Sequence, residues 1–91
     1  MKIGLLFETQ REMEDGDIDW NSLYKETLEQ CELADQMGFH NLWFVEHHFL
    51  TGFSGSPCPE VLFGALSQRT KNIRIGFGVS ILPSHHPIHI A

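Results

Sequence analysis

The chain alternates between short apolar runs and segments with helical periodicity. Apolar residues are nearly continuous over Ile3 to Phe7, Leu42 to Val45 and Ile73 to Leu82. Runs of this length without polar alternation are typical of strands that are buried on both faces, as in a parallel sheet. The pattern therefore predicts three β-strands, separated by segments that are long enough for crossover helices.

Two helices are predicted between these strands. From Ser22 to Met37, apolar residues recur at helical spacing opposite an acidic face, and Gly38 follows as a residue suited to ending a helix. The expected buried residues of this helix are Tyr24, Leu28, Cys31, Ala34 and Met37. The second helix should begin at Pro59, because proline suits the first helical position. Its expected buried residues are Leu62, Ala65 and Leu66.

The order strand, helix, strand, helix, strand predicts an α/β fold with a parallel sheet and right-handed crossovers. No repeat or linker divides residues 1–91, and a chain of 91 residues can build only one small core. A doubly wound dinucleotide-binding fold is disfavoured, because Glu8 to Arg11 offer no glycine to a pyrophosphate after the first strand. Gly76 and Gly78 lie inside a predicted strand, where they indicate either close approach of a ligand or close packing.

The formal net charge of −6 disfavours nucleic acid and anionic membranes as partners. No apolar run approaches the roughly 20 residues of a membrane span. Met1 to Gly4 lead directly into a strand, without the pattern of a signal peptide. Cys31 and Cys58 form neither a metal-type spacing nor a disulfide framework. We therefore expect a cytoplasmic protein with reduced thiols and no nucleic-acid or membrane partner.

Histidines gather on the links that follow the predicted strands. These links are long, as in Thr9 to Asn21 and His47 to Cys58, whereas the links that precede the strands are tight. Binding sites of parallel α/β proteins are built at the carboxyl ends of the strands, from these longer links. Five of the 6 histidines fall there: His47, His48, His85, His86 and His89. The alternative is chance clustering, because histidine is common on protein surfaces.

A metal centre is a competing interpretation, since carboxylate and imidazole groups are common metal ligands. The spacing disfavours it. His47 and His48 are adjacent, as are His85 and His86, and adjacent side chains on a strand point to opposite faces. Two imidazoles separated by one residue on a strand, or by three on a helix, would be aimed at one ion. We therefore expect no metal ligands.

The segment Trp43 to Phe49 resembles the end of the second barrel strand in bacterial luciferase and the related luciferase-like monooxygenases. Three further segments support the resemblance. Lys2 to Phe7 is similar to the family's opening strand, Ser56 to Val61 to the start of its second helix, and Gly76 to Pro87 to its third strand with the following turn. The resemblance implies the N-terminal β-α-β-α-β part of a (β/α)8 TIM barrel. Such a barrel predicts strands in sequential order, helices on one face, and a bare inner face.

The resemblance also implies an activity. The expected enzyme is a flavin-dependent monooxygenase, an oxidoreductase that oxidises an organic substrate such as an aldehyde with dioxygen and reduced flavin. FMN supplied by a separate flavin reductase is the expected cofactor, with a deazaflavin as the alternative, and the full-length protein is expected to be a homo- or hetero-oligomer. A complete barrel takes about 250 residues, so these residues alone should be an inactive fragment, a partial record or a remnant. The alternative function is a noncatalytic flavin-binding or remnant protein.

The family assigns roles to particular residues. The resemblance implies that His47 assists proton movement, which suits imidazole because it exchanges protons near neutral pH. It places the cofactor against Glu46, Gly78 and Val79, with a cis peptide bond near Gly78-Val79. The alternatives are a structural role for His47 and a solvated strand end for Glu46. Burial of the Glu46 carboxylate would cost several kcal/mol unless it were paired or hydrogen-bonded.

Overall fold

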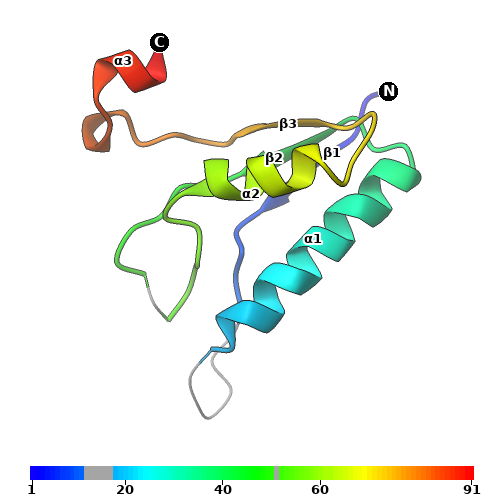
Figure 1. Ribbon diagram of the computed structural model, residues 1–91, viewed down its shortest axis with the longest axis horizontal. Coiled ribbons are helices and arrows are strands. Elements are labelled where there is room, and N and C mark those ends of the chain that lie inside the picture. Colours follow the sequence, from blue (N-terminus) through cyan, green and yellow to red (C-terminus); the bar gives the residue numbers. More distant parts are fainter. Residues whose placement is uncertain (12–17, 51) are drawn as a thin grey trace.

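The computed structural model describes residues 1–11, 18–50 and 52–91. The elements, in order, are β1 (Gly4–Phe7), α1 (Trp20–Gln36), β2 (Asn41–Phe44), α2 (Pro59–Ser67), β3 (Arg74–Phe77), the 3₁₀ helix η1 (Leu82–Ser84) and α3 (Pro87–Ile90) (Figure 1). The predicted alternation of strands and helices is confirmed. Part of the long link predicted from Thr9 to Asn21, residues 12–17, lies outside the described residues.

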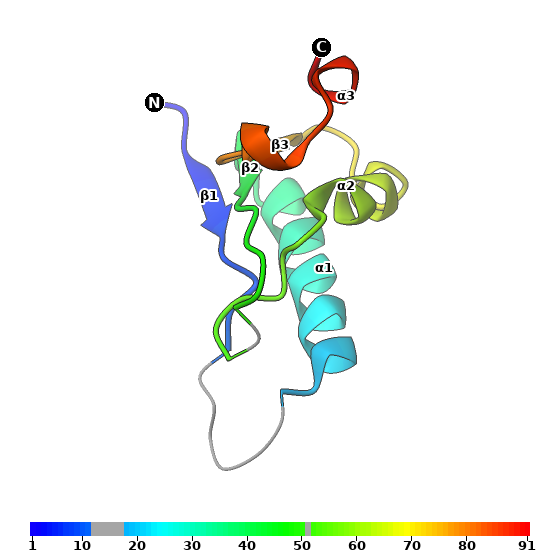
Figure 2. The same cartoon turned by 90° about the vertical axis from the view of Figure 1, so that its left-hand side faces the viewer.

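The three strands form a parallel sheet in the order β1-β2-β3. Leu5 pairs with Leu42, and Leu42 pairs in turn with Ile75. Helices α1 and α2 lie on the same side of this sheet (Figure 2). A doubly wound fold would reverse direction and place β1 between the other two strands. The sequential order and the one-sided helices therefore confirm the first part of a TIM barrel.

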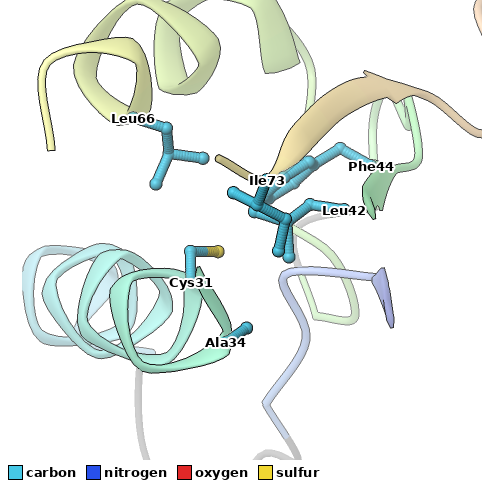
Figure 3. Packing of buried hydrophobic residues seen from close by; sticks show 6 residues of the cluster. All are labelled: Cys31, Ala34, Leu42, Phe44, Leu66 and Ile73. Atoms are coloured by element: carbon cyan, nitrogen blue, oxygen red, sulfur yellow. The ribbon is translucent and has the colours of Figure 1, made fainter. Parts of the chain in front are cut away.

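The core fills the space between the sheet and the two helices. Its buried members are Cys31, Ala34, Leu42, Phe44, Leu66 and Ile73 (Figure 3). The ring of Phe44 stacks on Phe7 at a centroid distance of 5.2 Å and meets the edge of Phe63 at 5.6 Å. Full burial of a large apolar side chain contributes about 1.5–3 kcal/mol. This core therefore fixes the positions of the strand ends that carry the site.

The buried stripe of α1 differs from the prediction. Its buried residues are Leu23, Thr27, Cys31 and Ala34. Met37 is exposed because the helix ends at Gln36 and Met37 is already the C-cap. Tyr24 is only half-buried, and its hydroxyl donates to the carbonyl oxygen of Gly55 on the loop before α2. Gly38 adopts a φ of 83°, which confirms its predicted role after the helix.

Helix α2 begins at Pro59 as predicted, and Leu66 is fully buried. Ala65, however, is exposed, and Phe63 packs against the core in its place. The aromatic packing accounts for this difference, because the ring of Phe63 lies between Phe44 and Phe77, 5.6 and 4.9 Å from their ring centroids.

Strand β3 is shorter than the predicted run from Ile73 to Leu82. It ends at Phe77: the amide of Gly78 still donates to the carbonyl of Phe44 on β2, but from Ser80 onward the chain bonds to a side chain and not to that strand. The amide of Ile81 and the hydroxyl of Ser80 donate to the carboxylate of Glu46. The chain then turns through η1 before α3 (Figure 1).

The face of the sheet away from the helices is apolar and open. Leu6 is 58% exposed and its register partner Trp43 is 44% exposed. This confirms the bare inner face that a barrel predicts. Among the helices of the described residues, none is long and apolar enough to cross a membrane.

Candidate active site

The loops that follow β1 and β2 are bonded to each other at the carboxyl edge of the sheet. Gln10 and Ser54 form an antiparallel bridge, and the amide of Gly55 donates to the carbonyl of Thr9 at 3.0 Å. The amide of His47 donates to the carbonyl of Ser56 at 2.9 Å. These backbone bonds hold the first residues after the two strands side by side.

This arrangement brings His47 against Glu8. The Nε2 atom of His47 lies 3.2 Å from Oε2 of Glu8, and both side chains are partly exposed. Because an ionised carboxylate only accepts hydrogen bonds, this geometry favours the tautomer with the proton on Nε2 and leaves Nδ1 as the atom that can accept a proton. The imidazole also meets the edge of Phe53 at a centroid distance of 6.3 Å.

Glu8 was not among the predicted site residues. It is the first polar residue after the apolar run of β1, at a carboxyl strand end, as Glu46 is after β2. That position was the signal available in the sequence. The pairing itself was not visible, since Glu8 and His47 are 39 positions apart.

Glu46 is buried, so its interpretation as a solvated strand end is wrong. The residue is 2% exposed, and its carboxylate accepts hydrogen bonds from five donors. The imidazoles of His48 and His85 donate through Nε2 at 2.7 and 2.8 Å. The amide of Ile81 donates at 2.8 Å, and the hydroxyls of Ser84 and Ser80 donate at 3.1 and 3.2 Å.

The ionisation of Glu46 follows from these contacts. Burial by itself raises the pKa of a carboxyl group, because it disfavours the charged form. Here the hydrogen bonds from His48, the Ile81 amide, His85 and Ser84 outweigh burial and lower the pKa of Glu46 to about 2. Glu46 is therefore a carboxylate at neutral pH. His47 and His48 diverge as predicted, since one contacts Glu8 and the other contacts Glu46.

The peptide bond Gly78–Val79 is cis, as the resemblance implied. The amide of Gly78 donates to the carbonyl of Phe44 at 2.7 Å. A Cβ atom at Gly78 would lie 3.1 Å from Cβ of Trp43 and 3.3 Å from Cδ1 of Leu6. Val79 is 69% exposed. The chain thus leaves the sheet in close contact with its open apolar face.

Gly76 is explained by packing. A Cβ atom there would lie 2.8 Å from the indole ring of Trp43, which covers the position of a side chain. Of the two interpretations for a glycine in this strand, close packing is therefore sufficient at Gly76.

The remaining histidines divide into two groups. His85 joins the Glu46 cluster, whereas His86, the N-cap of α3, and His89 within α3 are exposed and lie near each other, with ring centroids 6.0 Å apart. His40 lies at the opposite end of the sheet, where its Nδ1 is 2.8 Å from Oδ1 of Asn41. Within residues 1–11, 18–50 and 52–91, no group of three histidine, cysteine or acidic side chains is arranged to hold a metal ion.

Comparison with known protein sequences finds relatives that share one family. A family described as "Luciferase-like monooxygenase" matches residues 1–91. The oxygenase component of flavin-dependent trigonelline monooxygenase from Acinetobacter baylyi is 39% identical over 69 residues, which are 76% of this chain and 19% of that protein. Limonene 1,2-monooxygenase from Rhodococcus erythropolis is 40% identical over 75 residues, which are 82% of this chain and 19% of that protein.

Solved structures extend the similarity to the fold. The oxygenating constituent of 3,6-diketocamphane monooxygenase from Pseudomonas putida, in complex with FMN, matches 99% of this chain with a TM-score of 0.83 and 25% identity. Apo-MsnO8 matches 99% of this chain with a TM-score of 0.86 and 27% identity. The chain spans 24% and 26% of these two structures, and about a fifth of the curated relatives. On this evidence, the chain belongs to the luciferase-like monooxygenase family.

Proposed function

We propose that the complete protein encoded by the gene is a flavin-dependent monooxygenase that oxidises an organic substrate with dioxygen and reduced flavin. The observation that carries this proposal is the carboxylate–imidazole pair of Glu8 and His47 at the carboxyl edge of a partial TIM barrel. Active sites of TIM-barrel enzymes lie at this edge. The relatives named as monooxygenases support the same function.

The residues at the end of β3 fit a flavin. Val79, Leu6 and Trp43 expose apolar surface near the point where the chain leaves the sheet, which suits a planar, largely apolar ring system. We assign the cofactor-binding role to Gly78 and Val79, with Glu46 in the wall behind them. When bound, the reduced flavin supplies the electrons that activate dioxygen.

Reduced FMN is the proposed cofactor, and a separate flavin reductase is the proposed partner. A related solved structure contains FMN, and one relative is named an oxygenase component, which supports a two-component system. Titration of the complete protein with FMN and with a deazaflavin separates the two cofactors. Mass measurement of the complete protein in solution tests the expected homo- or hetero-oligomer.

His47 is the proposed proton carrier. Its Nε2 is held by Glu8, so Nδ1 can accept a proton from the substrate or return one to it. A cavity of about 250 Å³ beside His47 is lined by mostly apolar side chains, including Trp20, Tyr24 and Phe49. This cavity fits the apolar part of an organic substrate, with the imidazole at its polar end.

The test is His47→Ala in the complete protein, measured as product formed per reduced flavin consumed. Loss of a general acid or base slows the step it serves by about 10² to 10⁴. Flavin binding should persist, because His47 is one side chain among several contacts. Oxygen consumption should then become uncoupled from product formation.

The matched control is His40→Ala, because His40 lies at the opposite end of the sheet. His48 is unsuitable as a control, since it donates to Glu46. Product yield in His47→Ala equal to that of the wild type would contradict the catalytic role. A wild type that binds FMN but forms no product with any aldehyde or ketone tested would instead favour the noncatalytic alternative.

A further inference from the structure

The carboxylate of Glu46 joins two loops of the carboxyl edge. One donor, His48, belongs to the loop after β2, whereas the other four belong to residues 80–85 after β3. The carboxylate itself is completely covered, with a side-chain exposure of 0%. A molecule bound at this edge would therefore contact the residues around Glu46 and not its carboxylate.

The cost of burying a charge makes residues 80–85 the necessary partner of this carboxylate, because they supply most of its hydrogen bonds. A buried carboxylate without hydrogen bonds is strongly unfavourable, and each donor that it lacks adds to that penalty. Among the described residues, only the turn that ends at His85 supplies donors from backbone, hydroxyl and imidazole groups at once. Opening this turn would remove four of the five donors of the carboxylate, so these hydrogen bonds favour the closed conformation of the turn.

The same contacts fix the segment before the turn. Gly78 is held to β2 by the hydrogen bond from its amide to the carbonyl of Phe44. Ser80 and Ile81 are held to Glu46, which follows β2 in the chain. Val79 lies between these two attachments. The cofactor-contacting segment proposed above is thus anchored on both sides to the end of one strand.

We propose that Glu46 is a positioning residue of the flavin site, which acts by holding Gly78 and Val79 through the turn at residues 80–85. This role rests on the proposed function, because the segment it positions is the proposed cofactor contact. It makes Glu46 part of the site without direct contact to the flavin. Misplacement of positioned groups by about 1 Å can slow a reaction by up to about 100-fold.

The test is Glu46→Gln in the complete protein, with Glu29→Gln as the matched control on the exposed face of α1. Glutamine keeps the size of the side chain but loses the charge and one acceptor oxygen. Without flavin, hydrogen exchange at the amide of Ile81 should become at least about 10-fold faster, because its acceptor is weakened. With oxidised FMN as the probe, Kd from fluorescence quenching should rise about 10- to 100-fold. Glu29→Gln should change neither quantity.

Three outcomes overturn the role. Unchanged exchange at Ile81 in Glu46→Gln would show that the carboxylate does not hold the turn. Faster exchange with an unchanged Kd for FMN would reduce Glu46 to a purely structural residue. If the wild type does not bind FMN, the proposed function fails and the positioning role fails with it, whereas the first two results leave the proposed function intact.

Milder variants cover the case in which Glu46→Gln does not fold. Ser80→Ala and His85→Ala each remove one donor and leave the carboxylate with its other partners. Both should speed exchange at Ile81 and weaken FMN binding by smaller factors than Glu46→Gln. Wild-type values of both quantities in both variants would overturn the proposal.

Discussion

The lowered pKa of Glu46 predicts a specific acid dependence of stability. The folded-state pKa is about 2, below the ordinary value of 4.5, so ionised Glu46 stabilises the fold above pH 4.5 and loses this contribution as the pH falls toward 2. At about 1.4 kcal/mol per pH unit, the difference corresponds to about 3 kcal/mol at neutral pH. By pH 3, about 2 kcal/mol of this contribution should be lost.

Other groups also titrate in this range, and a matched variant isolates Glu46. The carboxylate of Asp35, for example, has a lowered pKa because it accepts a hydrogen bond from the amide of Lys71. Asp35 is present in both the wild type and Glu46→Gln, so its effect cancels when their free energies of unfolding are subtracted. Urea denaturation of both proteins at pH 7 and pH 3 gives that difference at each pH. The free energy of unfolding of the wild type minus that of Glu46→Gln should be about 2 kcal/mol smaller at pH 3 than at pH 7. A difference that stays the same at both pH values would refute the argument.

Two further predictions concern packing and are measured by thermal or urea denaturation. Gly78→Ala should destabilise the fold by about 1–3 kcal/mol, because its Cβ would lie 3.1 Å from Cβ of Trp43. Gly64→Ala, on a helix position with nothing within 4 Å, should instead stabilise by about 0.5–1 kcal/mol; the same sign for both changes would contradict the packing argument. Leu66→Ala should cost about 2–5 kcal/mol as a cavity in the core. Val61→Ala, at an exposed position of the same helix, should change stability by less than about 0.5 kcal/mol, and equal losses would show that the core is wrongly placed.

The sequence determined the elements and their order. Apolar runs and helical periodicity are local properties, and except at the end of β3 they placed the strands and the two long helices correctly within a few residues. Pro59 and Gly38 marked helix ends because their backbone preferences do not depend on distant contacts. The position of His47 after β2 was also enough to place it at the carboxyl edge, where sites of parallel α/β proteins are found.

The tertiary structure decided which side chains meet. Apart from His48, the partners of His47 and Glu46 come from other loops, up to 39 positions away, so no local pattern could select Glu8 or residues 80–85. The end of β3 at Phe77 was hidden for the same reason, since the apolar run continues through Leu82 although the amide of Ile81 bonds to Glu46 and not to a strand. From the sequence alone, a carboxylate at the end of an apolar strand can be either solvent-exposed or buried. Four of its five donors come from residues 80–85 and are in place only when the loop after β3 closes on Glu46, and the five together make burial the stable state.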